Sequence, residues 1–215
     1  MFPLTPEQKQ ELKVTAWIAL ICLVFGFLSG NLFAAEIPPN AHKYRADLTR
    51  SARLSWGMDA PIATFAAQVH QESGWNPQAV SRVGAKGLAQ FMPATADWIG
   101  GINPELAQRQ PDNPTWALRA LTTYDRWLWE RIQADNDCER MAMVLSSYNG
   151  GLGWLLKDKA MAQAAGDSRN RWWGNVERYN AGRSREAFAE NRGYPVRIIK
   201  VIQPTYASWG QGVCA

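Results

Sequence analysis

The chain has few of the residues from which metal sites are built. Among its 215 residues there are two histidines and three cysteines. Neither His42 nor His70 has a second ligand near it, and no Cys-x-x-Cys or Cys/His spacing occurs, so no metal site is predicted. Cys138 and Cys214 either pair in an oxidising compartment, which would tie the C-terminal tail to the body of the protein, or remain buried free thiols.

The chain also lacks a dense run of one charge. Its 23 Lys and Arg and 19 Asp and Glu give a formal charge of +4, and the basic residues are dispersed. A nucleic-acid-binding protein is expected to carry a basic stripe, so nucleic acid is not predicted as a partner. No alternating strand pattern, repeat or low-complexity tract occurs, and nothing indicates an obligate protein partner. The soluble part is therefore predicted to be one all-α domain.

Charge is absent from residues 14–35, VTAWIALICLVFGFLSGNLFAA, which are mostly apolar and long enough to cross a bilayer. We predict a transmembrane or signal-anchor helix here, after a polar leader at 1–13. A cleaved signal peptide is the main rival and a buried core helix the third alternative. Phe33 disfavours cleavage, because it stands where a small residue is needed. The basic residues downstream of this segment favour keeping the chain that follows it in the cytoplasm. Charge therefore does not support export of the main domain, and only the function argued below does.

Seven helices are predicted beyond this segment. Residues 36–55 form a linker and the first helix, and residues 56–215 form the main domain. The first helix is expected at 42–56. The second begins after a cap at Asp59, with Pro61 in its first turn. The other five are expected from Pro93 to Gly100–Gly101, at 112–132, from Cys138 to Tyr148, at 153–166, and at 191–209 with a bend near Pro204. Glycine at 150 or 151 is expected to end the Cys138–Tyr148 helix.

Tryptophan is abundant, with 11 copies. Aromatic faces can stack on sugar rings, but core packing is the simpler interpretation for any single one of these residues. Several fall near predicted loops or helix ends: Trp56, Trp75, Trp98, Trp154, Trp172 and Trp173.

Glu72 is isolated among acidic residues, because no Asp or Glu follows it until Asp97. It shares one helical face with Ile62, Phe65 and Val69, at the last turn of the predicted helix. Burial and the negative end of the helix dipole would both raise its pKa. A carboxylic acid that keeps its proton near neutral pH is suited to protonating a glycosidic oxygen. The alternative is a glutamate whose carboxyl group simply extends into solvent.

Two further patterns follow Glu72 along the chain: GAKGLAQFMP at 84–93 and SSYNGG at 146–151. With Glu72-Ser73, Ala79, Ser81 and a weaker match at Glu190-x-Arg192-x-Tyr194, the sequence resembles the soluble lytic transglycosylase family over residues 56–200. That family's catalytic domain has a goose-type, lysozyme-like fold. Residues 56–215 would then be a catalytic domain, preceded by the membrane or signal-anchor helix.

The resemblance implies cleavage of the β-1,4 bond between N-acetylmuramic acid and N-acetylglucosamine in peptidoglycan, with formation of 1,6-anhydro ends. Glu72 would be the acid and base, and Tyr148 would orient its carboxyl group. The residues that would bind substrate are Ser81, Gln90, Met92, Tyr148 and Asn149. Because the substrate's acetamido group and 6-hydroxyl complete the chemistry, no cofactor or second carboxylate is needed. Asp59, Asp97 or Asp112 could still approach Glu72 in space.

Two other functions stay open: a hydrolytic muramidase of the same fold and a non-catalytic peptidoglycan-binding envelope protein. The WW pair at 172–173 and the apolar segment also resemble bacteriophage lysis enzymes, that is, endolysins with a signal anchor. The predicted partners are peptidoglycan glycan strands and a membrane. The predicted location is tethered to the inner membrane or released into the periplasm, of a host cell if the chain is phage-encoded.

Overall fold

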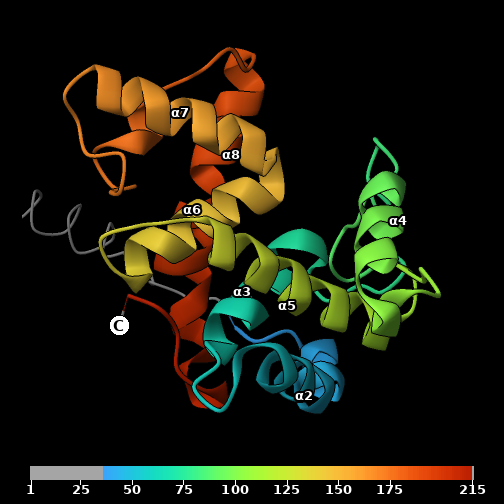
Figure 1. Ribbon diagram of the computed structural model, residues 1–215. Coiled ribbons are helices and arrows are strands. Elements are labelled where there is room, and N and C mark those ends of the chain that lie inside the picture. The colour runs from blue at the N-terminus through green and yellow to red at the C-terminus, as the bar shows by residue number, and fades with distance from the viewer. Residues whose placement is uncertain (1–35, 215) are drawn as a thin grey trace, which may run out of the picture. The chain divides into compact units, whose positions relative to one another are not determined.

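The computed structural model describes residues 36–214, which fold into helices joined by loops (Figure 1). The α-helices are α2 (Arg45–Trp56), α3 (Ile62–Ser73), α4 (Pro93–Ile102), α5 (Pro114–Arg131), α6 (Asp137–Gly150), α7 (Leu152–Ala164) and α8 (Arg185–Pro195). Short helical segments are η1 (Pro39–Tyr44), η2 (Pro104–Leu106), η3 (Val176–Arg178), η4 (Val196–Ile202) and η5 (Gln203–Trp209). Only isolated β-bridges occur in the described range, so the predicted all-α class is confirmed.

The predicted leader and anchor, residues 1–13 and 14–35, lie outside the described residues. Between residues 36 and 214, no helix combines the length and apolarity that a membrane span requires.

The helix starts that depend on local signals are confirmed. Asn113 caps α5, accepting hydrogen bonds from the backbone N–H groups of Thr115 and Trp116, and proline follows at the first helical position. Pro93 opens α4, and Gly151 at φ 91° follows the end of α6. These signals lie within a few residues of the helix ends that they set.

The predicted cap at Asp59 is wrong. Helix α3 begins at Ile62 with Pro61 at the N-cap, and no side chain caps it. The backbone N–H of Ala63 instead donates to the carbonyl of Gln211 at 3.0 Å, and the Gln211 side chain donates to the Asp59 carbonyl at 2.6 Å. The C-terminal tail therefore supplies the acceptor that a side-chain cap would have provided.

The last predicted helix is longer and more irregular than expected. Helix α8 starts at Arg185, capped by Ser184, and continues into the π-helical η4 and the 3₁₀-helical η5. Pro204 stands in the first turn of η5. Because proline lacks a backbone donor, the predicted bend coincides with this change of helix type.

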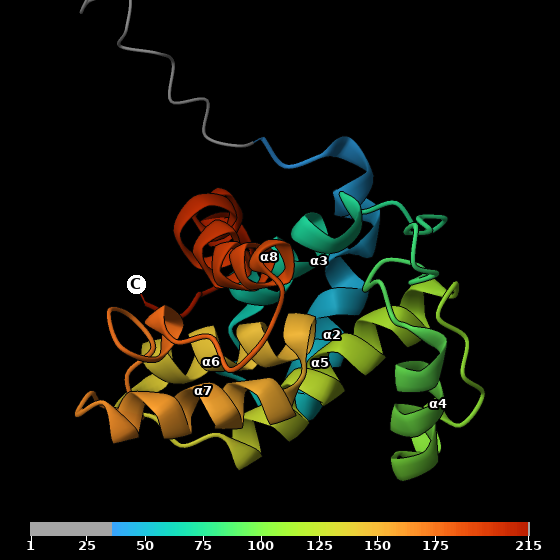
Figure 2. The same cartoon turned by 90° about the horizontal axis from the view of Figure 1, so that it is seen from above.

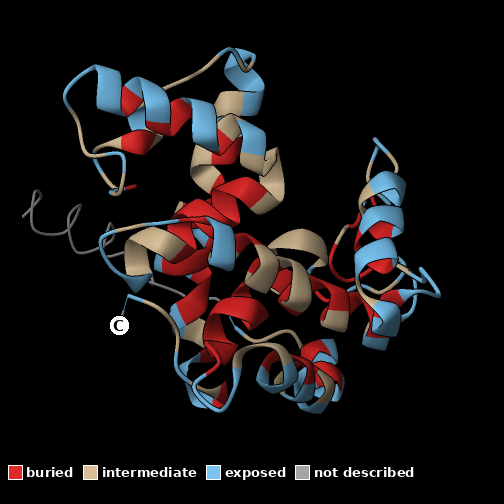
Figure 3. Ribbon diagram, viewed as in Figure 1, coloured by how far each residue is buried: buried red, intermediate tan, exposed pale blue. Residues whose placement is uncertain are grey.

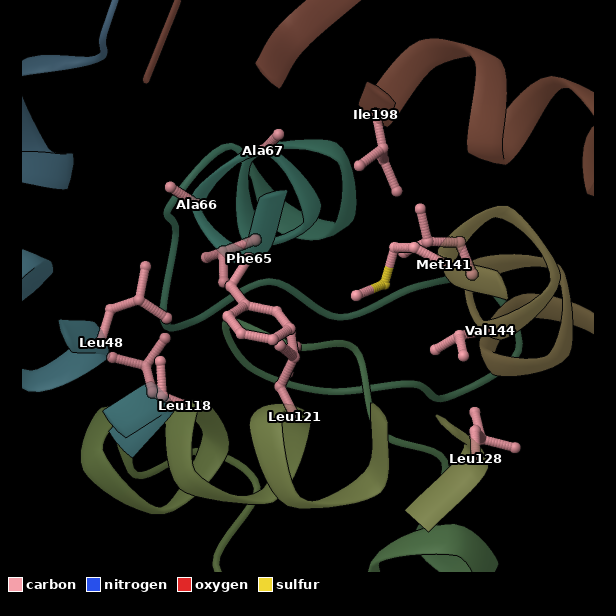
Figure 4. Close-up of a cluster of buried hydrophobic side chains, with 14 of the residues drawn as sticks. Leu48, Phe65, Ala66, Ala67, Leu118, Leu121, Leu128, Met141, Val144 and Ile198 are labelled. Atoms are coloured by element: carbon pink, nitrogen blue, oxygen red, sulfur yellow. The ribbon is translucent and has the colours of Figure 1, made fainter. Parts of the chain in front are cut away.

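Helices α3, α5 and α6 enclose the core, with α4 and α7 on opposite sides of them in two perpendicular views (Figures 1 and 2). Buried residues concentrate on the facing sides of the central helices (Figure 3). Phe65 points from α3 toward Leu121 of α5, close to Leu48 and Leu118, while Met141 and Val144 come from α6 (Figure 4). The core thus holds α3 among α2, α5, α6 and the η4 segment that carries Ile198.

Cys138 and Cys214 form a disulfide with their Cα atoms 4.8 Å apart, so they are not free thiols. The tail before Cys214 is also held by hydrogen bonds. Gln203 donates from Nε2 to the Val213 carbonyl at 2.6 Å, and the Val213 N–H donates to Thr64 Oγ1 at 3.1 Å. The disulfide and these bonds tie the tail to α6 and α3.

Candidate active site

Glu72 lies in the last turn of α3, where the sequence predicts it. Ile62, Phe65 and Val69 are buried along the same helical face. Gly74 adopts the left-handed conformation (φ 57°, ψ 29°) and its N–H donates to the His70 carbonyl at 2.9 Å. This terminates the helix immediately after Glu72, so the carboxyl group stands where the buried face meets a cleft.

The cleft has a volume of about 650 Å³. Its walls come from α3, the loop before α4, and helices α4, α5, α6 and α8. All five predicted contact residues line it together with Glu72: Ser81, Gln90, Met92, Tyr148 and Asn149. Tyr124, Glu190, Tyr194 and Arg197 also line it, although they were not among the predicted site residues.

The environment raises the pKa of the Glu72 carboxyl group to about 7. Burial is the main cause, because it disfavours the charged form. A hydrogen bond from Tyr194 lowers this pKa, and the nearby carboxylate of Glu190 raises it further. Glu72 therefore holds its proton close to neutral pH and can still release it.

Tyr194, rather than Tyr148, makes the hydrogen bond to Glu72. The Tyr194 hydroxyl donates to Oε1 of Glu72, whereas the Tyr148 hydroxyl donates to the Ala89 carbonyl at 2.7 Å. Tyr148 thus joins α6 to the loop before α4, and its ring forms part of the cleft wall. The weak Glu190-x-Arg192-x-Tyr194 match was the sequence signal for the residue that contacts Glu72.

Ser81 and Gln90 brace the loop that forms one wall of the cleft. Gln90 donates from Nε2 to the carbonyls of Ala79 at 3.1 Å and Gly87 at 2.9 Å. Ser81 Oγ accepts from the Ala85 N–H at 2.9 Å. Gly87 has φ 74°, and a Cβ there would lie 2.0 Å from the Pro111 carbonyl oxygen, so only glycine fits. The amide donors of Gln90 are thus occupied, and its Oε1 remains for a ligand.

A second carboxylate, Glu190, lies in the cleft. Asn149 donates from Nδ2 to Glu190 at 3.2 Å, and its Oδ1 accepts from Asn191 at 3.0 Å. The aspartates proposed as possible neighbours of Glu72 do not line the cleft. Asp97 pairs with Arg109 at 3.6 Å and Asp112 with Lys86 at 3.8 Å, while the backbone of Asp59 contacts the C-terminal tail.

Asp125 and Gln68 form a fully buried polar pair one helical turn before Glu72. Gln68 donates from Nε2 to Asp125 Oδ1 at 3.5 Å, and the two remaining oxygens have no partner within residues 36–214. Burial raises the pKa of Asp125 well above its usual value. A protonated Asp125 has a hydrogen-bond donor of its own, whereas the ionised carboxylate offers only acceptors.

The chain matches the Transglycosylase SLT domain family over residues 48–170. It is 29% identical over 138 residues to the membrane-bound lytic murein transglycosylase F of Pasteurella multocida, which covers 64% of this chain and 24% of that protein. The protein of the same name from Marinobacter nauticus is 27% identical over 199 residues, which is 83% of this chain and 37% of the relative. This chain therefore spans well under half the length of either relative.

Among solved structures, the 70 kDa soluble lytic transglycosylase SLT70 from Escherichia coli superposes with a TM-score of 0.52 at 23% identity. The match covers 78% of this chain and 25% of that one. At this level of identity the likeness establishes the fold, and the lysozyme-like prediction is confirmed. Across residues 36–214, no cluster of three or more His, Cys, Asp or Glu side chains is arranged to hold a metal ion.

Proposed function

Because the chain belongs to the Transglycosylase SLT domain family, we propose that it is a peptidoglycan lytic transglycosylase. It cleaves the β-1,4 bond between N-acetylmuramic acid and N-acetylglucosamine and leaves 1,6-anhydro-muramic ends. The observation that carries this proposal is the Glu72 carboxyl group, which lies in a cleft and has a pKa of about 7. With this pKa it can both donate and accept a proton near neutral pH.

In the first step, Glu72 donates its proton to the glycosidic oxygen, and the bond from that oxygen to the muramic anomeric carbon breaks. The acetamido oxygen of the same sugar supplies electrons to the anomeric carbon. In the second step, the Glu72 carboxylate removes the proton of the 6-hydroxyl, whose oxygen attacks the anomeric carbon and displaces the acetamido oxygen from it. The glutamate ends protonated, and no water is consumed. The Tyr194 hydrogen bond stabilises the carboxylate between the two steps.

The predicted contact residues are proposed to bind the sugars on either side of the scissile bond. The Gln90 carbonyl oxygen is suited to accept from an amide or hydroxyl, and Met92, 40% exposed, offers an apolar surface to a sugar ring. The Tyr148 ring forms a wall beside Glu72, Ser81 supports the loop, and Asn149 holds Glu190 in place.

A hydrolytic muramidase is the second candidate, and the observation that favours it is Glu190. A second carboxylate in the cleft could activate a water molecule in place of the 6-hydroxyl. Mass spectrometry of digested cell wall separates the two activities. Anhydro-ended muropeptides support the transglycosylase, whereas reducing ends support the muramidase and would overturn our proposal.

The Glu72→Gln variant tests the role of the acid and the third candidate, a binding protein without activity. Gln keeps the shape of the side chain but cannot transfer a proton, so we expect wall lysis to fall by about 10²–10⁴-fold. Glu186→Gln, at an exposed position on α8 that does not line the cleft, is the matched control and should lyse wall like the unmodified chain. Unchanged lysis by Glu72→Gln would remove Glu72 from the mechanism, and an inactive unmodified chain would favour the binding protein.

We also propose that the domain acts outside the cytoplasm, because the Cys138–Cys214 disulfide is typical of an oxidising compartment. Residues 14–35 would carry it there as a signal anchor, in an endolysin or another wall-cleaving enzyme. Fractionation and N-terminal sequencing of active enzyme test this. A membrane-bound chain that keeps residues 1–35 supports a tether, and a periplasmic chain without them supports release. Active enzyme with reduced thiols in the cytoplasm contradicts export.

A further inference from the structure

Trp98 is a large aromatic residue at the surface of α4, with 37% of its side chain exposed. The core-facing side of α4 carries Ala96 and Ile99, both buried, so Trp98 is not part of the buried stripe of its own helix. Trp75 and Trp172, by contrast, are fully buried and serve in the core. The exposure of Trp98 therefore calls for an explanation other than core packing.

Two aromatic rings of α5 hold Trp98 in a fixed orientation. Its ring lies 4.8 Å from that of Trp127 at an interplanar angle of 84° and 5.6 Å from that of Tyr124 at 73°. Tyr124 in turn lies 5.3 Å from Tyr148 in the cleft. Edge-to-face contacts of this kind restrict the ring, so a ligand that stacks on Trp98 loses little side-chain entropy.

Trp98 itself lines neither the cleft nor a second hollow of about 560 Å³, but its neighbours on α4 and α5 line one or the other. On α4, Thr95 lines the cleft and Ile102 lines the second hollow, one turn before and one turn after Trp98. On α5, Tyr124 lines the cleft and Trp127 lines the second hollow. Both helices thus run from one concavity to the other, and Trp98 touches α5 at the crossing.

We infer that Trp98 is a stacking platform for a sugar ring and carries a glycan strand from the cleft into the second hollow. This inference rests on the proposed function, because it takes the polymer cleaved at Glu72 as the ligand. A pyranose ring presents C–H groups on one face, which pack against an indole ring. The platform is Trp98 rather than Trp127, because the Arg131 guanidinium already covers the Trp127 ring at 3.9 Å from its centroid.

The second hollow has the side chains that amino sugars require. Asn103, Glu105 and Arg126 offer both donors and acceptors to hydroxyl and acetamido groups. Glu105 is paired with Arg119, and Arg126 with Glu130 at 3.0 Å, so these charges are held in place without a ligand. A strand that passes Trp98 would therefore meet preorganised polar groups.

The test measures binding in a Glu72→Gln background, in which the strand is not cleaved. The affinities for a purified tetrasaccharide and for glycan strands of eight or more sugars are measured by calorimetry, and the long-to-short ratio is compared between variants. We expect Trp98→Ala to lower this ratio by about tenfold, close to the contribution of one stacked aromatic ring. Trp98→Phe, which keeps an aromatic face, should retain most of the ratio, and Trp98→Leu should not.

Trp129→Ala is the matched control on α5. The Trp129 ring packs on Trp56 and lies under the Arg140 guanidinium, whereas Trp98 packs on Tyr124 of the cleft and Trp127 of the second hollow. Its long-to-short ratio should equal that of the parent, whatever its effect on thermal stability. An unchanged ratio in Trp98→Ala, or equal ratios for Phe and Leu, would overturn the inference while leaving the proposed function intact. A parent that binds neither glycan would overturn both.

Discussion

Removal of the Tyr194 hydroxyl group tests how the pKa of Glu72 is set. Tyr194→Phe keeps the ring and deletes the donor to Oε1 of Glu72. A hydrogen bond to a charged group contributes about 1.5–3 kcal/mol, and about 1.4 kcal/mol corresponds to one pKa unit. Because this bond favours the carboxylate, its loss should raise the pKa of Glu72 by about 1–2 units from its present value of about 7.

The assay is kcat/KM against pH on a soluble glycan fragment, since its alkaline limb reports the pKa of the acid in the free enzyme. We expect the limb of Tyr194→Phe to move to higher pH by about 1–2 units and the maximal rate to fall, because a weaker acid protonates the leaving oxygen less readily. Tyr206→Phe is the control. Its hydroxyl accepts from Trp75 at 2.6 Å and lies 3.0 Å from His70, outside the cleft. An unchanged or acid-shifted limb in Tyr194→Phe would refute this reasoning.

Three further changes give distinct outcomes. Glu190→Gln should lower the pKa of Glu72 and move the alkaline limb of the same profile to lower pH, and a shift to higher pH would contradict this. Replacing Cys138 and Cys214 by serine should lower the unfolding free energy by about 4 kcal/mol, because the disulfide closes a loop across 76 positions. Urea denaturation of the unmodified chain with and without reductant measures the same loss, and equal midpoints in the two conditions would contradict it. Asp125→Asn should flatten the fall in stability as pH rises above about 4, because the raised pKa of Asp125 lets the folded state keep a proton that the unfolded chain loses. An unchanged slope would show Asp125 to be ionised.

The features that the sequence predicts correctly are those fixed by neighbouring residues. The start of α4 at Pro93, the end of α6 at Gly150–Gly151 and the buried face beneath Glu72 all depend on short spacings. The prediction at Asp59 failed because the acceptor for α3 comes from Gln211, which is remote in the chain. No local pattern indicates such a contact.

In the site, too, local features were predicted and contacts between distant parts of the chain were not. The six site residues that the family resemblance implied all line the cleft, but the other lining residues and the hydrogen-bond partners did not follow from it. Tyr194 rather than Tyr148 reaches Glu72, since α8 returns to the end of α3 from more than a hundred residues away. The donors of Gln90 are used within its own loop, so its role as a ligand-binding donor could not be judged without the fold.

The raised pKa of Glu72 has a consequence for the stability of the whole domain. Folding raises the pKa of Glu72 from 4.5 to about 7, so the folded domain binds this proton more tightly than the unfolded chain does. The unfolding free energy therefore falls as pH rises through this range. The difference amounts to about 3 kcal/mol above pH 7. Glu72→Gln should therefore unfold at higher urea than the unmodified chain at about pH 8 and at the same urea at about pH 4, where both side chains are neutral. If Glu72→Gln were no more stable at the higher pH, the carboxyl group would be ionised without cost in the folded domain, and it would have no proton to give at neutral pH.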